Sequence, residues 1–223
     1  MKAMILCAGL GNRMLPLTKH TPKPLLMVNN KPLVEWHIER LYRAGFREVI
    51  INIAYLGWMI KEYLGDGQRY GLSIIYSDEQ LEGGLETAGG IIKALPLLGD
   101  KSFLVINGDI WCDYPYSNDF RLYDNLAHLI LVPNPPQHPQ GDFGLKDSRV
   151  ILGSEKLYTF AGVGYYSPKL FDSIPYGKRP LAPILKESIK RGDISGEYYT
   201  KEWRDIGTPE RLEELNSKFS GRR

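Results

Sequence analysis

The sequence predicts an α/β fold with a mixed, mostly parallel central sheet flanked by helices, and three observations lead to this prediction. In the first half of the chain, short apolar runs end at glycine or at polar residues, as in strands buried on both faces of a sheet. Segments with helical periodicity separate these runs, and such alternation is typical of parallel βαβ units. After residue 110 a proline-rich stretch and a glycine-containing strand pattern loosen the alternation, so we expect the second half to form mixed sheet.

The first half is expected to contain strands, helices and one long loop. The strands are expected over residues 3–8, 49–53, 72–76 and 103–106, and the helices over residues 32–44, 58–64 and 87–95. Pro32 suits the first turn of a helix, because the N–H group that proline lacks has no partner in that turn. Residues 9–24 hold two glycines, three prolines and three basic residues, which indicates a long loop, and loops of this length are usually functional.

The second half shows fewer regular elements. Strands are expected over residues 126–132 and 159–166, a proline-rich loop over 133–141, and helices over 181–190 and 209–219. Thr208 and Pro209 suit the N-cap and the first helical position of the last helix. At 223 residues, the chain is expected to form a single domain over residues 1–223.

Composition and charge exclude several classes of protein. Lys and Arg total 28 against 26 Asp and Glu, a net charge of +2, so no strong overall field exists to bind nucleic acid or an acidic membrane surface. Cys7 and Cys112 cannot form a disulfide framework or a four-ligand zinc site, which fits a reducing compartment. No apolar run approaches the roughly 20 residues that span a bilayer, and the short apolar start lacks signal-peptide features. We therefore expect a cytoplasmic protein with no membrane or nucleic-acid partner.

A glycine-rich loop directly follows the first expected strand. Gly9 and Gly11 let the backbone bring N–H groups against an anion, and Arg13 and Lys23 add positive charge suited to a polyphosphate. A dinucleotide-binding fingerprint would need a third glycine and an unbroken helix, but Pro16 follows five residues after Gly11. A Walker loop would need Gly-Lys-Ser/Thr, which the sequence lacks. The loop therefore predicts a different phosphate site, with a plain glycine turn bearing solvated charges as the alternative.

Two aspartates stand where a metal ion could bind phosphates. Asp109 ends an Asn-Gly-Asp segment after a buried strand, at the edge where open α/β sheets bind ligands. Asp205 precedes the last expected helix. Magnesium takes one or two carboxylates and completes its octahedral shell with water and substrate phosphates, so His and Cys ligands are not needed. The aspartates predict a Mg²⁺ site, with a turn or capping role as the alternative for each.

Taken together, these motifs resemble the sugar-phosphate nucleotidylyltransferases, whose signature is a strand followed by AGxGxR(M/L)xPLT and then PKP. The sequence has CAGLGNRMLPLT at residues 7–18 and TPKPL at residues 21–25. The resemblance continues in family order through LETAGG at residues 85–90, NGD at 107–109 and WRDIGT at 203–208, so it covers nearly the whole chain. Cys7 replaces the first alanine of the family signature, a change between small residues at a strand end.

The resemblance implies a Rossmann-like nucleotidyltransferase fold, with a nucleotide-binding half over about residues 1–110 and a sugar-binding half over about residues 111–223. The implied reaction is attack by a phosphate oxygen of a sugar 1-phosphate on the α-phosphorus of a nucleoside triphosphate, with release of pyrophosphate. A phosphate monoester is already anionic near neutral pH, so no general base is required. All four histidines lie outside these motifs, so catalysis is expected to rest on alignment and charge neutralisation.

The resemblance also implies roles for individual residues. Arg13 and Lys23 are expected to be catalytic, and Asp109 and Asp205 to hold Mg²⁺. Nucleotide contacts are expected from Gly9, Gly11, Asn12, Arg13, Lys23, Gln80, Gly84 and Asn107. Sugar contacts are expected from Gly141, Asp142, Gly144 and Gly162, because the glycines leave room for a pyranose ring. For Gln80, a residue of a surface hairpin turn is the alternative.

Within the family, the short length and the Glu-Thr-Ala-Gly-Gly segment most resemble the branch that transfers the uridylyl group of UTP to N-acetylmuramic acid 1-phosphate in peptidoglycan recycling. The alternatives are guanylyl transfer from GTP to mannose 1-phosphate and thymidylyl or uridylyl transfer to glucose 1-phosphate. A noncatalytic sugar-nucleotide sensor is an alternative of another class, which the complete set of charged residues disfavours. Positive charge for the lactyl carboxylate of the muramic sugar could come from Lys146, Lys178, Arg179 and Lys186. The sequence leaves the oligomeric state open.

Overall fold

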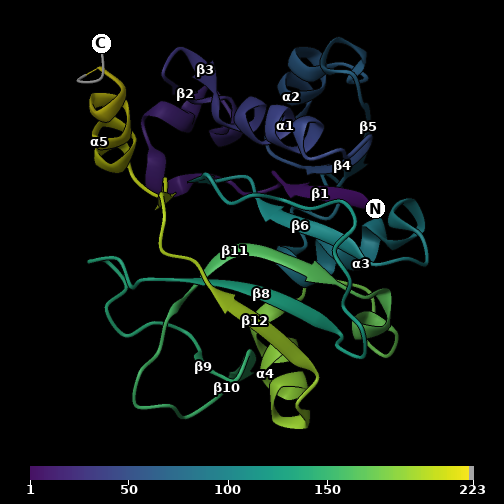
Figure 1. Ribbon diagram of the computed structural model, residues 1–223. Coiled ribbons are helices and arrows are strands. Elements are labelled where there is room, and N and C mark those ends of the chain that lie inside the picture. Colours follow the sequence, from purple (N-terminus) through teal and green to yellow (C-terminus); the bar gives the residue numbers. More distant parts are fainter. Residues whose placement is uncertain (221–223) are drawn as a thin grey trace.

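The computed structural model describes residues 1–220, and a nine-stranded sheet in the order β5-β4-β1-β6-β11-β8-β12-β10-β9 forms its centre (Figure 1). The strands of this sheet are β1 Lys2–Leu6, β4 Glu48–Ile53, β5 Ser73–Asp78, β6 Phe103–Asn107, β8 Ala127–Val132, β9 Gly144–Lys146, β10 Arg149–Ile151, β11 Thr159–Tyr166 and β12 Ile194–Tyr198. Strands β5, β4, β1 and β6 run parallel, whereas β11 is antiparallel to both of its neighbours. Four of the eight pairings are parallel, and the predicted mixed sheet with a parallel first half is confirmed.

The helices lie close to their expected ranges. They are α1 Leu33–Arg43, α2 Gly57–Leu64, α3 Glu86–Leu98, α4 Leu181–Arg191 and α5 Pro209–Ser220. Pro96 lies inside the last turn of α3 and does not end it, so this helix runs three residues beyond its expected end at Leu95. Residues 9–24 form the expected loop, which contains short 3₁₀ turns. Over residues 1–220, no helix combines the length and apolar character that crossing a lipid bilayer requires.

Helices cover both faces of the parallel strands. Along β1, Ala3 and Ile5 belong to a buried cluster with residues of α1 and α2, whereas Met4 belongs to a second cluster with residues of α3 and α4. Successive side chains of a strand point to opposite faces of the sheet, so both faces of β1 are buried. This double burial explains the unbroken apolar sequence of the strand.

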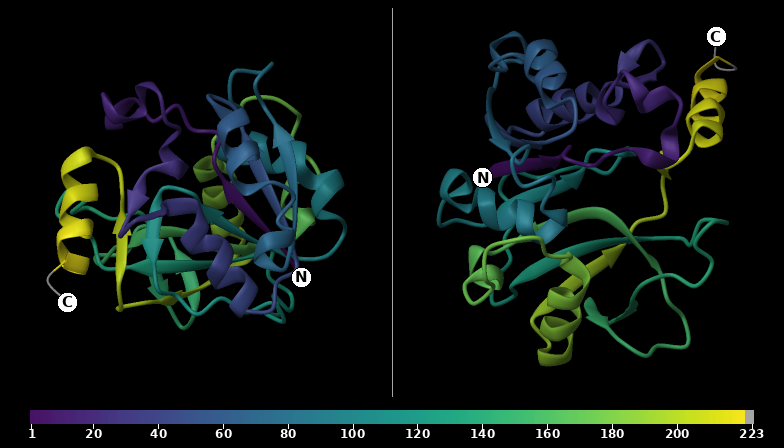
Figure 2. Two further views of the ribbon diagram at one scale, coloured as in Figure 1. Left: turned by 90° about the horizontal axis from the view of Figure 1, so that it is seen from above. Right: turned by 180° about the vertical axis from the view of Figure 1, so that it is seen from behind.

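The last helix, α5, lies to one side of the sheet, beside the segment that follows β1 (Figure 2). Leu212 and Leu215 of α5 belong to a third buried cluster together with Met14 and Leu26 of that segment. Two short strand pairs accompany this arrangement: β2 Met27–Val28 with β3 Lys31–Pro32, and β7 Ile110–Cys112 with β13 Trp203–Asp205. The C-terminal part of the chain therefore helps to hold the loop after β1 in place.

The sequence did not predict several of these strands. Strands β7, β9, β10 and β13 are three residues long, and β2 and β3 are two residues long. Segments this short show no alternation of apolar and polar residues that could identify them. Strand β12 has the sequence ISGEY and pairs with the buried strand β8. Its glycine and glutamate interrupt the apolar pattern by which a buried strand is recognised.

Buried His37 should make the stability of the protein pH-dependent. The side chain is 1% exposed, and neither ring nitrogen has a hydrogen-bond partner within residues 1–220. Burial, followed by the nearby charge of Arg40, lowers the pKa of His37 from 6.5 to about 4. The unfolded chain therefore binds a proton that the folded protein does not, and the free energy of unfolding should fall by about 3 kcal/mol as the pH drops from 6.5 to 4.

The variant His37→Gln should flatten this dependence, measured as Tm between pH 4 and pH 7. His20→Gln is the matched control, because it removes a histidine that is exposed rather than buried. If the slope of Tm against pH is the same in the wild type and in His37→Gln, another group causes the acid sensitivity.

Candidate active site

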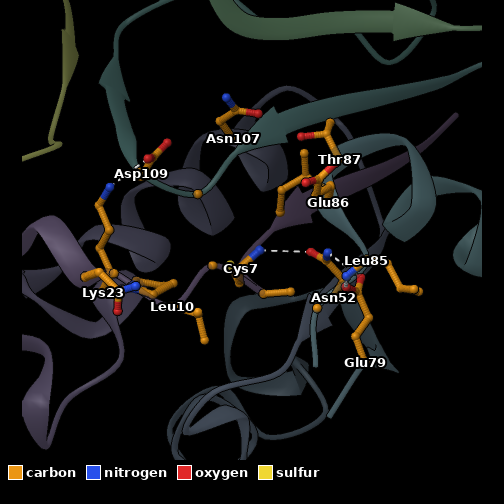
Figure 3. Close-up of a pocket in the computed structure, with 18 of the residues that line it drawn as sticks. Cys7, Leu10, Lys23, Asn52, Glu79, Leu85, Glu86, Thr87, Asn107 and Asp109 are labelled. Atoms are coloured by element: carbon orange, nitrogen blue, oxygen red, sulfur yellow. Dashed lines mark hydrogen bonds and ion pairs between the residues drawn. The ribbon is translucent and has the colours of Figure 1, made fainter. Parts of the chain in front are cut away.

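A cavity of about 470 Å³ opens at the carboxyl ends of β1 and β6, where open α/β sheets bind ligands (Figure 3). Adjacent parallel strands bring the loops after β1, β5 and β6 to this one edge. The cavity is lined by residues 6–14, 23–24, 52, 79, 83–87, 107–109, 178 and 207. Most of the first-half motifs found in the sequence therefore meet in one space.

Internal hydrogen bonds fix the loop that follows β1. The N–H of Met14 and the hydroxyl of Thr18 each donate to the carbonyl of Gly11 at 2.8 Å. Thr18 is 1% exposed, so its bond is shielded from water. These contacts hold the loop, from Gly9 to Arg13, in the wall of the first cavity.

Lys23 joins the end of this loop to the end of β6. Its Nζ donates to Oδ2 of Asp109 at 2.6 Å, and the Lys23 side chain is only 11% exposed (Figure 3). The N–H of Leu26 donates to the carbonyl of Lys23 at 3.1 Å, which fixes the backbone here in a 3₁₀ turn. The ammonium group is thus held in the cavity wall, at a defined position beside a carboxylate.

A second cavity, of about 280 Å³, shares three of its lining residues with the first: Arg13, Asn107 and Asp109. Its other lining residues are Ile110, Pro135, Gln137, His138, Asp142, Thr159, Phe160, Ala161, Gly162, Trp203 and Asp205. The second half of the chain supplies most of this wall. The two cavities therefore meet at one arginine, one asparagine and one aspartate.

The two predicted metal ligands, Asp109 and Asp205, both line the second cavity. Strand β13 pairs with β7 so that Asp205 stands opposite Ile110, and the N–H of Ile206 donates to the carbonyl of Asp109 at 2.9 Å. The Asp205 carboxylate also forms an ion pair with Arg211. Within residues 1–220 no group of three or more His, Cys, Asp and Glu side chains could hold a metal by itself. Two carboxylates in the wall of a cavity of about 280 Å³ fit Mg²⁺, which takes its remaining ligands from water and phosphate.

The two cavities contain no activated cysteine among the described residues. Cys7 lines the first cavity, but burial, followed by the charge of Asp109, raises the pKa of its thiol well above the usual range. The thiol therefore stays protonated and unreactive near neutral pH. The arrangement instead offers cations, backbone groups and carboxylates, which suit the binding and alignment of phosphates.

The structure brings together most of the residues that the sequence singled out. The first cavity is lined by Gly9, Gly11, Asn12, Arg13, Lys23, Gly84, Asn107 and Asp109, and the second by Arg13, Asn107, Asp109, Asp142, Gly162 and Asp205. At Gly162, whose φ is +73°, a Cβ atom would lie 2.5 Å from Nδ2 of Asn107. Gly162 therefore makes room for a neighbouring side chain of the site.

Three of the predicted contact residues, Gln80, Gly141 and Gly144, line neither cavity. Gln80 is exposed, and its backbone N–H donates to Oδ1 of Asp78 at 3.0 Å, as in a turn. A Cβ atom at Gly141 would meet Asn134, and one at Gly144 would meet Ser154. In this structure these glycines therefore accommodate the fold of the second half. Of the basic residues considered for the lactyl carboxylate, Lys178 lines the first cavity, whereas Lys146, Arg179 and Lys186 line neither.

Sequence reasoning missed other residues of the two cavities. Asn52 and Glu79 line the first cavity. The sequence offered one signal for them: Asn52 is a polar residue within the apolar strand β4, and Glu79 directly follows β5. His138 lines the second cavity, with Nε2 at 3.0 Å from Oδ1 of Asp142, while the N–H of Phe160 donates to Oδ2 of Asp142 at 2.8 Å. No local pattern in the proline-rich loop identified His138.

Comparison with known proteins defines the class of this protein. The nucleotidyl transferase family matches residues 2–221, so the chain belongs to that family, and the resemblance of its motifs is confirmed. An N-acetylmuramate alpha-1-phosphate uridylyltransferase of Neisseria meningitidis is 51% identical over 97% of each chain. A UTP–glucose-1-phosphate uridylyltransferase of Synechocystis sp. is 32% identical, and the match covers 93% of this chain but only 60% of that protein.

Solved structures show the same fold. An inositol-1-phosphate CTP transferase from T. maritima superposes with a TM-score of 0.78 at 17% identity, covering 98% of this chain and 96% of the other. A Bacillus anthracis protein described as a glucose-1-phosphate thymidylyltransferase superposes with a TM-score of 0.82 at 24% identity, covering 98% and 94%. The Rossmann-like nucleotidyltransferase fold is therefore confirmed.

Proposed function

We propose that this nucleotidyltransferase transfers the uridylyl group of UTP to N-acetylmuramic acid 1-phosphate. A phosphate oxygen of the sugar 1-phosphate attacks the α-phosphorus, the bond from that phosphorus to the bridging oxygen of the β-phosphate breaks, and UDP-N-acetylmuramic acid and pyrophosphate leave. The full-length 51% identity to the Neisseria meningitidis uridylyltransferase carries this proposal. Because the sugar comes from the cell wall, we further propose a role in peptidoglycan recycling in the cytoplasm.

The geometry of the two cavities supports an assignment of substrates. We assign the nucleotide to the first cavity, which residues before 110 mostly line, and the sugar phosphate to the second. The shared residues Arg13, Asn107 and Asp109 then mark the place where the α-phosphate meets the attacking phosphate. This assignment agrees with a single domain composed of a nucleotide-binding half and a sugar-binding half.

The charged residues have separate tasks in this proposal. Arg13 and the loop residues Gly9, Gly11 and Asn12 would bind the β- and γ-phosphates, and Arg13 would neutralise charge on the leaving pyrophosphate. Lys23 would contact the phosphates at the reacting centre. Because the nucleophile is already an anion, this chain need not supply a general base.

Asp109 and Asp205 would hold Mg²⁺. When bound, the ion would neutralise negative charge on the phosphates and hold the two substrate phosphates close together. Asp109 already accepts a hydrogen bond from Lys23, so carboxylate, lysine and phosphate would share one small region. Selection of the uracil base is assigned to the backbone of Gly83 and Gly84, which line the first cavity. Contacts to the sugar are assigned to Asp142 and Gly162, which line the second cavity.

Substrate selectivity tests the proposal. With UTP and Mg²⁺, kcat/KM should be about 10- to 100-fold higher for N-acetylmuramic acid 1-phosphate than for N-acetylglucosamine 1-phosphate, because a site that binds the lactyl carboxylate loses a charged hydrogen bond of about 1.5–3 kcal/mol with the second sugar. The two sugars form a matched pair that differs only in the lactyl group. Pyrophosphate release with all four nucleoside triphosphates gives the base preference.

Equal values of kcat/KM for the two sugars would contradict the proposed acceptor. A clear preference for GTP with mannose 1-phosphate, or for dTTP with glucose 1-phosphate, would favour a hexose-phosphate enzyme. Tight binding of nucleotides without any release of pyrophosphate would favour a noncatalytic sensor.

A further inference from the structure

A buried chain of hydrogen bonds crosses the wall of the first cavity (Figure 3). The N–H of Cys7 donates to Oδ1 of Asn52 at 2.8 Å, and Nδ2 of Asn52 donates to Oε1 of Glu79 at 2.7 Å. The N–H of Leu85 donates to Oε2 of Glu79 at 2.8 Å. The chain thus connects the end of β1, where the phosphate loop starts, to the loop of residues 79–85.

Glu79 holds the 79–85 loop by its side chain and by its backbone. While the carboxylate binds the N–H of Leu85, its own carbonyl accepts a hydrogen bond from Gly84 at 3.3 Å, and its N–H donates to the carbonyl of Ile53 at 2.7 Å. Both the side chain and the backbone of Glu79 are therefore bound to strand β4, through Asn52 and Ile53 respectively. Gly83, Gly84 and Leu85 line the cavity, so the position of the loop decides the shape of that wall.

A buried carboxylate is energetically unfavourable for a purely structural contact. Glu79 is 0% exposed, and its carboxylate forms no direct ion pair with any described residue. Burial raises its pKa, although the hydrogen bonds from Asn52 and Leu85 and the more distant charge of Lys93 act in the opposite direction. A buried charge without a cationic partner destabilises a fold, whereas an apolar residue of similar size would not. Groups of this kind occur preferentially at functional sites.

Helix α3 leaves space for the Asn52 and Glu79 side chains. Gly90 lies in α3, and a Cβ atom there would be 2.6 Å from Oε1 of Glu79 and 2.9 Å from Nδ2 of Asn52. Any side chain at Gly90 would therefore push the amide and the carboxylate apart. The absence of a side chain at this helix position permits the short contact between them.

We propose that Glu79, acting through Asn52, is a positioning residue that sets the distance between the base-contacting loop 79–85 and the phosphate loop after β1. By this role it sets the affinity and the base selectivity for the nucleoside triphosphate. The proposal rests on the proposed function in one respect, namely that the first cavity binds the nucleotide.

An exchange of the two polar groups tests this inference. In Glu79→Gln the introduced amide must turn its N–H₂ toward either Asn52 Nδ2 or the N–H of Leu85, so one of the two hydrogen bonds is lost. In the double variant Asn52→Asp/Glu79→Gln, the introduced carboxylate accepts from Cys7 with one oxygen and from the introduced amide with the other. The carbonyl oxygen of that amide then accepts from Leu85. The double variant therefore regains every hydrogen bond, with the carboxylate moved from position 79 to position 52.

Calorimetric Kd values for UTP and for inorganic tripolyphosphate, both with Mg²⁺, provide the measurement. Glu79→Gln should raise the Kd for UTP at least tenfold, as expected for the loss of a hydrogen bond to a charged group, and should reduce the preference for UTP over CTP. The Kd for tripolyphosphate, which has no base, should stay within about twofold of the wild type. The double variant should recover a UTP Kd within about threefold of the wild type.

Glu82→Gln is the matched control. Glu82 belongs to the same loop, but its carboxylate binds Lys93 and Tyr176 at the surface and does not line the cavity. Its replacement should leave the Kd for UTP unchanged. Should Glu79→Gln fail to fold, the double variant decides the question.

A double variant that is unfolded, or that binds UTP as weakly as Glu79→Gln does, would overturn the inference. A Glu79→Gln protein with a lowered Tm but an unchanged Kd for UTP would do the same, because it would reveal a purely structural contact. If the wild type instead prefers another nucleoside triphosphate, the proposed substrate fails, and the same variants are compared with that nucleotide.

Discussion

Replacing Lys23 by alanine is expected to lower kcat by about 10² to 10³, with little change in Tm. The loss of one preorganised electrostatic contact has an effect of this size. The Lys23 ammonium is held in the cavity wall by Asp109, so it is already in place when a phosphate arrives. Stability should change little, because the Asp109 side chain is 36% exposed and water can solvate it once Lys23 is gone.

The measurement is steady-state release of pyrophosphate with Mg²⁺ and both substrates saturating, combined with thermal unfolding. Lys19→Ala is the matched control, because Lys19 lies in the same loop but is exposed and lines neither cavity. Near-normal kcat in Lys23→Ala would show that this lysine does not contact the reacting phosphates.

Asp109→Asn and Asp205→Asn are each expected to lower activity by about 10² at limiting Mg²⁺ and to raise the Mg²⁺ concentration needed for half-maximal rate. Asparagine keeps the shape of the side chain but loses the charge that a hard cation requires. Wild-type activity should disappear in chelator and return with added Mg²⁺. Titrations of rate against Mg²⁺ for each variant provide the test.

The control for both is Asp113→Asn, since Asp113 follows β7 and binds the hydroxyl of Tyr199 at 2.5 Å outside both cavities. The ion pair between Asp205 and Arg211 makes a structural role the competing explanation for that residue. Wild-type activity of either Asn variant at limiting Mg²⁺ would assign that aspartate to the turn or the ion pair instead.

The sequence by itself determined the features that lie in contiguous segments. The parallel first half, the loop after β1 and the Asn-Gly-Asp segment each depend on residues that are neighbours in the chain, so apolar runs and glycine positions identify them. Their convergence at one edge of the sheet also follows, because carboxyl ends of adjacent parallel strands share an edge.

Only the tertiary structure decided which distant residues meet. Lys23 contacts Asp109 across 86 positions, and Asn52 contacts Glu79 across 27, because sheet order and the crossovers between strands set these distances. Asp205 reaches the cavity through β13 and β7, two strands too short to show a pattern of their own. Gln80 lines neither cavity because its turn with Asp78 leaves it exposed, and that placement depends on the three-dimensional course of the loop.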